Sequence, residues 1–344
     1  MRYFIITVCI IFASCGGKRT VLPEYMSITN NYVTVSGFAL GTYFKITYRD
    51  EKKRDYYDSI KNLLNTFENS LSVYRDSSLI SKINRNQYFA VDHYFTEMFD
   101  KAKKISELTG GAFDISASPL FDLWGWGAKK RANRVTPEMI DSLKQFVGMD
   151  KIYIENGKII KKFPAMTLNA NAIAKGYASD VVAGYLKNRQ ITDYLVDIGG
   201  EIVVRGKNKL GKEWLVGIDK PIDGNMISGT ELQAVMQITD RAIATSGDYR
   251  RFYIDTVDGQ KYSHTIDPHT GCPARQNILS ATVIADECIV ADAYATAFMV
   301  MGLKKTEEFL SKHHELEVFL VYSENNELKE YYSDNIKNRF IKIK

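Results

Sequence analysis

The sequence predicts an α+β fold with mixed sheets and packed helices, in a single large body with two interlocked lobes. The chain has 344 residues, of which 45% are hydrophobic and 25% charged, so it can bury a large core. Many short segments have the alternation typical of strands, and several longer ones have helical spacing. No internal repeat or low-complexity run interrupts the sequence. One domain over residues 37–344 is therefore expected.

Helices are predicted where apolar residues recur every three or four positions. These segments are residues 55–71, 97–108 and 169–186, and two helices between residue 288 and a terminal hairpin near 324–326. Strands are predicted at 32–35, 43–48, 151–154, 158–162, 194–198, 202–204, 214–218, 233–238, 242–244, 252–255, 260–265 and 279–285.

Residues 1–14 have the pattern of a lipoprotein signal peptide. Arg2 precedes an apolar run, residues 3–12, that is too short to span a bilayer as a mature helix. Small residues directly before Cys15 resemble a lipobox, so Cys15 is expected to carry lipid. Ordinary secretory cleavage is the alternative. Residues 15–36 are predicted to form a polar tether outside the core.

Charge and cysteine usage narrow the function classes. The net charge of +4 is small, and the basic residues are scattered without interleaved aromatic residues, so no nucleic-acid partner is expected.

The four cysteines are too few for a disulfide scaffold. Cys9 lies in the signal segment and Cys15 is expected to carry lipid, so only Cys272 and Cys288 remain. Those two either pair in an oxidising compartment or stay free, and their spacing does not match a metal site.

An aspartate and a threonine one helical turn apart form the first candidate site. Asp292 lies within an apolar helix, where an isolated carboxylate would cost several kcal/mol. Thr296 lies on the same face, so the pair offers two hard oxygen ligands suited to Mg²⁺. The alternative is structural: Asp292 caps its helix and Thr296 bonds back to a carbonyl a turn earlier.

Two further segments carry groups suited to phosphate binding and proton transfer. Lys175 and Gly176 lie near a predicted helix N-terminus, which attracts anions such as phosphate, although such a pair is common.

His264 and Asp267 lie at a strand end before a tight turn, where either group could take a proton from a hydroxyl nucleophile. A hydrogen-bonded turn without catalytic role is the alternative for this second pair.

Aromatic side chains could hold a flat ring near these groups. Tyr74 lies in a loop and Phe113 stands beside Asp114, so the two aromatic rings could flank such a ring. Residues 245–249 form a polar turn. The alternative is that the aromatic side chains serve the core.

Taken in order, eight segments resemble the FAD:protein FMN transferase (ApbE) family. They are residues 37–42, 71–84, 110–114, 172–178, 198–201, 244–249, 264–273 and 291–296. The resemblance covers nearly all of the mature chain. It implies an ApbE-like fold related to the T-fold, and a periplasmic, lipid-anchored enzyme at the inner membrane that binds FAD and Mg²⁺. Such an enzyme transfers FMN to a threonine or serine hydroxyl of a flavoprotein subunit in a membrane redox complex and releases AMP.

The resemblance also assigns roles to individual residues. His264 matches the histidine linked to catalysis. Apart from the resemblance, we expect the nearby Asp267 to assist it. The metal ligands implied are Asp292, Thr296 and the backbone carbonyl of Ala172. The FAD-contacting positions implied are Leu40, Tyr74, Ala112, Phe113, Asp114, Asn169, Lys175 and Ile266. At two of these the family usually has another residue, methionine in place of Leu40 and aspartate in place of Asn169.

Three other functions compete with flavin transfer. The same site with water as nucleophile would be a magnesium-dependent FAD pyrophosphatase that gives FMN and AMP. A non-catalytic, lipid-anchored flavin-binding protein would keep the ligand without reaction. A structural or adhesive lipoprotein would bind no flavin.

Overall fold

The computed structural model describes residues 25–128, 132, 134–222, 225, 229–249, 252–254, 261–325 and 327–341. The predicted signal peptide and Cys15 lie outside these residues, as do Asp255, Gln260 and Asn326 of the predicted strands and hairpin. Within the described part, no helix combines the length and the apolar character needed to cross a bilayer.

A nine-stranded antiparallel sheet forms the centre of the molecule, in the order β1-β2-β3-β6-β7-β10-β13-β14-β15. Its strands are β1 (Tyr25–Thr29), β2 (Tyr32–Ala39), β3 (Thr42–Arg49), β6 (Tyr194–Ile198), β7 (Glu201–Arg205), β10 (Arg241–Gly247), β13 (Ile278–Ala285), β14 (Glu317–Glu324) and β15 (Glu327–Tyr332). The smaller sheets comprise β8 (Trp214–Asp219), β9 (Leu232–Ile238) and β16 (Phe340–Ile341), then β4 (Ile152–Glu155) with β5 (Lys158–Lys161), and β11 (Phe252–Ile254) with β12 (Lys261–Ser263).

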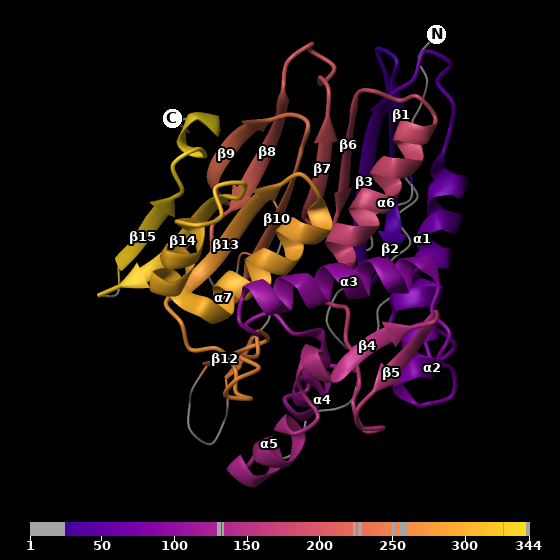
Figure 1. The fold of residues 1–344 in the computed structure, drawn as a ribbon. Coiled ribbons are helices and arrows are strands. Elements are labelled where there is room, and N and C mark those ends of the chain that lie inside the picture. The colour runs from indigo at the N-terminus through magenta and orange to yellow at the C-terminus, as the bar shows by residue number, and fades with distance from the viewer. Residues whose placement is uncertain are drawn as a thin grey trace, which may run out of the picture.

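Helices cover one face of the large sheet (Figure 1). They include α1 (Tyr57–Leu71), α3 (His93–Leu108), α6 (Ala174–Asn188) and α7 (Cys288–Leu310), the last kinked at Gly302. The shorter helices are α2 (Leu79–Asn84), α4 (Ser118–Leu123), α5 (Pro137–Lys144) and the 3-10 turns η1 (Ile115–Ala117), η2 (Met149–Lys151) and η3 (Lys337–Arg339). Apolar residues of α1, α3, α6 and α7 meet this face of the sheet in the main core.

The opposite face of the large sheet packs against the three-stranded sheet. Met236 and Ile238 of β9 meet Ile284 of β13 and Phe319 of β14 in a second core. Strand β13 is consequently buried on both faces, which explains its nearly continuous apolar sequence. A third, smaller core lies under α4 and α5.

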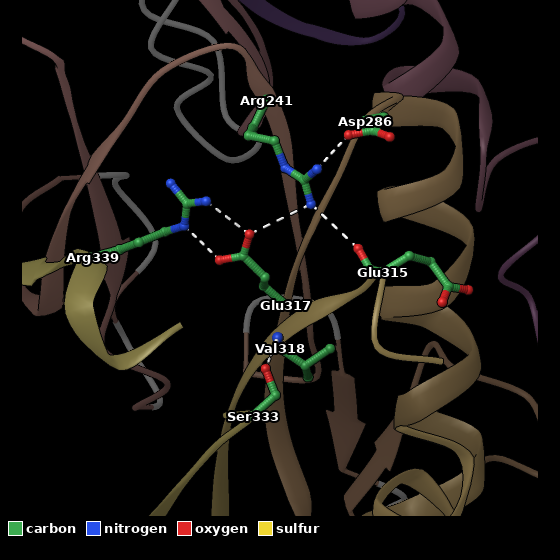
Figure 2. A network of polar contacts seen from close by, with 7 residues as sticks. All are labelled: Arg241, Asp286, Glu315, Glu317, Val318, Ser333 and Arg339. Carbon is green, nitrogen blue, oxygen red and sulfur yellow. Dashed lines mark hydrogen bonds and ion pairs between the residues drawn. The ribbon is translucent and has the colours of Figure 1, made fainter. Parts of the chain in front are cut away.

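A charged network joins strands of the large sheet to the chain near η3 (Figure 2). Glu317 of β14 accepts hydrogen bonds from Arg339, at 2.5 Å from Nε and 2.8 Å from Nη2. Arg241 of β10 lies 3.5 Å from the same carboxylate and also bonds Asp286. The network therefore links β10 and β14 of the large sheet to η3.

The predicted α+β class is confirmed, and most predicted elements occur within a few residues of their expected bounds. The predicted tether is wrong at its C-terminal end, because β1 and the start of β2 form part of the sheet. Val33 and Val35 are fully buried, so this part of residues 15–36 belongs to the core. Cys272 and Cys288 are free thiols, and Cys288 is buried.

Candidate active site

The candidate site begins at the first turn of α6, which carries Lys175 and Gly176. The predicted helix start at residue 169 is wrong, since α6 begins at Ala174. The Asn169 side chain accepts a hydrogen bond from the Asn171 amide at 2.9 Å and holds the preceding residues in turns. Asparagine side chains compete with helix formation in this way. The prediction that Lys175 lies near a helix N-terminus is confirmed.

Asp292 of α7 closes this first turn from the neighbouring helix. Its side chain is buried, and Oδ2 accepts a hydrogen bond from the Gly176 amide at 2.9 Å. A Cβ on residue 176 would lie 2.3 Å from the Cys288 carbonyl oxygen and 2.7 Å from Asp292 Cβ. Only glycine therefore allows the two helices to approach so closely.

The structural alternative for Asp292 and Thr296 is wrong in its details. Asp292 caps α6 and not its own helix, whose N-cap residue is Glu287. The Thr296 hydroxyl lies 3.3 Å from the hydroxyl of Ser246, at the end of β10. Both predicted ligand side chains therefore face other elements of the site.

A second carboxylate connects the same two helices in the opposite direction. Asp180 of α6 accepts hydrogen bonds from the backbone amides of Cys288 and Ile289, at 2.9 and 2.7 Å. Burial raises the pKa of Asp180 to about 7, although these two hydrogen bonds lower it. Each helix thus supplies the cap for the start of the other.

The carbonyl oxygen of Ala172 is available to a ligand, because the Gly176 amide, four residues on, bonds Asp292 instead. In the described chain, the Gly176 amide bonds the carboxylate, and no backbone amide bonds the carbonyl of Ala172. Burial raises the pKa of Asp292, which Lys175 lowers in part. A buried carboxylate, a hydroxyl and a free carbonyl are the hard oxygen donors that Mg²⁺ prefers, so the residues fit such an ion. The described residues contain no cluster of three His, Cys, Asp or Glu side chains suited to a metal.

Lys175 forms an ion pair with Glu201, the first residue of β7. Burial, the largest influence, raises the pKa of the Glu201 carboxyl; Lys175 lowers it and Asp292 raises it. The turn before Glu201 is fixed by a 2.9 Å hydrogen bond from the Gly200 amide to Asp197. The ammonium group therefore lies beside a helix N-terminus, with a buried anion as its partner.

His264 follows β12 and faces a carboxylate from another strand end. Its Nδ1 lies 3.6 Å from Oδ1 of Asp248, which also accepts a 2.7 Å hydrogen bond from the Thr265 hydroxyl. The prediction that Asp267 assists His264 is wrong. Its carboxylate instead bonds His269, at 2.9 Å from the amide and 3.1 Å from Nδ1.

Three of the predicted flavin positions are brought together by short contacts. The Asn169 amide donates to the Ile115 carbonyl at 2.8 Å, next to Asp114. Asn171 donates to the Tyr74 hydroxyl at 2.7 Å, and the Tyr74 side chain is largely exposed. Tyr74, Asp114 and Asn169 therefore belong to neighbouring segments, although they are far apart in sequence.

The chain segment 112–114 combines core packing with a local cap. Ala112 and Phe113 are buried, so the core alternative holds for the Phe113 ring and not for Tyr74. Asp114 Oδ1 accepts hydrogen bonds from the amide and hydroxyl of Ser116, at 2.7 and 2.6 Å. Burial raises the pKa of Asp114 to about 6 against the effect of these bonds.

The last two predicted positions lie at turns beside these segments. Leu40 occupies the β2–β3 turn with a φ of 51° and packs against the main core. Ile266 is buried in the third core, in the turn that follows His264. In the same turn, His269 Nε2 lies 2.8 Å from the Gly110 carbonyl oxygen and links it to the segment that holds Asp114.

Four acidic residues of the site were not assigned a role from the sequence. They are Asp180, Asp197, Glu201 and Asp248. Glu201 lies directly after two glycines in the segment 198–201 that carries the family resemblance, and Asp248 lies in the polar turn 245–249. An acidic residue beside glycine at a strand end is the sequence pattern that indicates such site residues.

Comparisons with known proteins identify the family and the fold. A model of the ApbE family matches residues 40–320. The chain belongs to the ApbE family. Over 313 residues it is 34% identical to the FAD:protein FMN transferase of Vibrio cholerae, covering 89% of this chain and 92% of that protein.

Solved structures of the family share the fold. The flavin transferase ApbE from Vibrio cholerae superposes with a TM-score of 0.79 at 33% identity, covering 90% of this chain and 99% of that one. The apo flavinyl transferase ApbE of Pseudomonas stutzeri gives 0.79 at 26% identity, covering 92% and 97%. The predicted family and its fold are confirmed.

Proposed function

We propose that this protein is an FAD:protein FMN transferase that moves FMN from FAD to a threonine or serine hydroxyl of an acceptor flavoprotein and releases AMP. Membership of a family whose relatives carry this name supports the proposal. The observation that carries it is the first turn of α6, where Lys175, the Gly176 amide and buried Asp292 converge. Such a turn suits a pyrophosphate, because a helix N-terminus and an ammonium group both favour anions.

The reaction is proposed to depend on Mg²⁺. Asp292, the Thr296 hydroxyl and the Ala172 carbonyl would hold the ion, and burial of Asp292 without a full counter-charge supports this choice. When bound, the ion would offset negative charge on the pyrophosphate and on the departing AMP. Lys175 would bind the same phosphates directly.

His264 is the proposed general base. It would accept the proton of the acceptor hydroxyl as that oxygen attacks the phosphorus on the FMN side, and the bond from this phosphorus to the AMP oxygen would break. Asp248, at 3.6 Å from Nδ1, would stabilise the protonated imidazole. Most of the rate gain would come from positioning and electrostatics, as in phosphoryl transfer generally.

The flavin would lie against the segments that the sequence indicates. The exposed Tyr74 ring, the backbone of Ala112 and Phe113, and Asp114 would contact it, together with Asn169. Leu40 and Ile266 would form apolar walls at the two adjoining turns.

The protein is further proposed to be anchored by lipid on Cys15 at the periplasmic face of the inner membrane. The apolar run before small residues and Cys15 supports this placement. The acceptor would then be a flavoprotein subunit of a membrane redox complex.

Mass spectrometry of a candidate acceptor subunit incubated with enzyme, FAD and Mg²⁺ tests the function. We expect His264→Ala to keep FAD binding and lose transfer by roughly 100-fold or more. Asp292→Ala should lose transfer, and added Mg²⁺ should no longer raise whatever activity remains. Asp267→Asn is the matched control and should transfer normally, since this carboxylate contacts His269. An undiminished FMN adduct with the alanine variant of His264 or of Asp292 would contradict the assignment.

Incubation without an acceptor separates the rival functions. Rapid AMP release from FAD and Mg²⁺ would indicate a pyrophosphatase. Bound yellow flavin with neither AMP nor adduct would indicate a non-catalytic flavin-binding protein, and the absence of flavin binding would indicate a structural lipoprotein.

A further inference from the structure

Glu201 is a buried carboxylate with one oxygen engaged and one free. Its side chain is 3% exposed, and Oε1 contacts the Lys175 ammonium. The other oxygen, Oε2, is buried without a hydrogen-bond partner in the described chain. Buried polar atoms in native proteins nearly always have partners, so such an oxygen indicates a donor that is not part of the protein.

The position of Glu201 is fixed on both sides. Its carbonyl accepts a 2.8 Å hydrogen bond from the Ser179 hydroxyl of α6, the helix that begins next to Lys175. On the other side, Gly199 and Gly200 turn the chain into β7 with positive φ angles of 65° and 101°. The backbone of Glu201 is therefore fixed relative to α6.

The charges around Lys175 make its position depend on this carboxylate. Asp292 and Asp197 both act on Glu201 electrostatically and raise its pKa, while Lys175 lowers it. Lys175 also lowers the pKa of Asp197 and of Asp292, so the ammonium acts on three acidic groups. Without the Glu201 charge, the remaining carboxylates would attract the ammonium away from its present place.

We propose that Glu201 is a positioning residue for substrate binding: it holds the Lys175 ammonium at the first turn of α6 for the pyrophosphate of FAD, and its free oxygen accepts a hydrogen bond from the bound, hydrated ligand. This role rests on the proposed function, because FAD is the ligand. Outer groups that orient a binding side chain typically change ligand affinity by 10–100-fold when they are replaced.

A double-mutant cycle on FAD affinity tests the role. The four proteins are the full chain, Glu201→Gln, Lys175→Met and the double variant, each titrated with FAD in the presence of Mg²⁺ by quenching of flavin fluorescence. We expect Glu201→Gln to weaken binding by about 10-fold in the native background. In the Lys175→Met background, the same change should have little effect, because the lysine is the group through which it acts.

Stability separates positioning from a purely structural role. Glutamine keeps the volume of the side chain and removes a buried charge, so Glu201→Gln should melt no lower than the native protein. Glu317→Gln is the matched control: a buried glutamate of the large sheet, paired with arginines, whose loss should lower the melting temperature and leave FAD affinity unchanged.

Distinct results would overturn the inference. Equal affinity of Glu201→Gln and native protein for FAD would remove the role of Glu201 and leave the proposed function intact. Equal losses in both lysine backgrounds would show that Glu201 does not act through Lys175. Failure of the native protein to bind FAD would contradict the proposed function and this role together.

Discussion

Glu317 and Glu201 are both buried glutamates in ion pairs, but their surroundings differ in charge balance. Glu317 faces two arginines, and one of these, Arg241, also binds Asp286 (Figure 2). Two cations thus meet two carboxylates. Arg339 donates to both oxygens of Glu317, so neither lacks a partner.

Around Glu201 the balance is different. Lys175 pairs with it, while Asp292 and Asp197 add negative charge nearby. One oxygen of Glu201 has no partner among the described residues. A balanced network stabilises the fold, whereas an excess of buried negative charge costs stability and is typical of a site that awaits a cation or another ligand.

The largest effect is expected on the balanced side. Glu317→Ala would leave Arg339 and Arg241 without their shared carboxylate, which should lower the free energy of unfolding by about 3 kcal/mol. Urea denaturation would measure this loss, and FAD titration should show unchanged affinity. A variant that loses FAD affinity without losing stability would contradict the division between the two regions.

A somewhat smaller loss is expected where α6 meets α7. Gly176→Ala would place a Cβ 2.3 Å from a backbone carbonyl oxygen, so the helices must separate. We expect a loss of about 1–3 kcal/mol in unfolding free energy, together with loss of flavin transfer. Gly184→Ala on the same helix is the control. Apart from its own helix, its added Cβ would meet no atom of the described residues within 4 Å, so the variant should stabilise the protein slightly, since alanine favours helix. Similar behaviour of the two variants would show that close packing at Gly176 is unimportant.

The free energy of unfolding should depend on pH through the buried carboxyl of Asp180. Because the pKa of Asp180 is about 7 in the folded protein and 3.8 in its ordinary state, the folded state binds this proton more tightly. The free energy of unfolding should therefore fall as the pH rises from about 4 to about 7, by about 1 kcal/mol per pH unit in the steepest part. Asp180→Asn should flatten this slope in urea denaturation series, and identical slopes for the two proteins would refute the expectation.

The smallest effect is expected at the exposed edge of the site. Tyr74→Phe keeps the ring and removes the hydrogen bond from Asn171. FAD affinity should fall by about tenfold at most, because a single partly exposed hydrogen bond contributes about 1 kcal/mol. A larger loss in a fluorescence titration would mean that the hydroxyl itself contacts the flavin.

The sequence pattern predicted the elements better than their partners. Asp292 could be placed in a buried helix because apolar residues surround it in sequence. Its partner, the Gly176 amide, lies 116 positions away and depends on how two helices cross, which spacing does not encode. Nearness in the chain predicts Asp267 as the helper of His264, but the carboxylate that lies 3.6 Å from Nδ1 is that of Asp248, from the end of another strand.

Tertiary context also changed the N-terminal boundary. A polar stretch after Cys15 predicts a tether to residue 36, yet β1 and β2 pair over five positions from Tyr25 to Thr29. Val33 and Val35 are buried in the main core, which also contains residues of α6 and α7 far along the chain. Sequence periodicity over four residues could indicate a strand here, but not that it joins the central sheet.

The exchange of carboxylates between α6 and α7 has a consequence for how the molecule opens. Asp292 holds the Gly176 amide, and Asp180 holds the amides of Cys288 and Ile289. Neither helix start can fray without breaking a bond that belongs to the other. In hydrogen exchange, these three amides should therefore behave as one cooperative unit, and a ligand bound at either helix start should slow exchange at both.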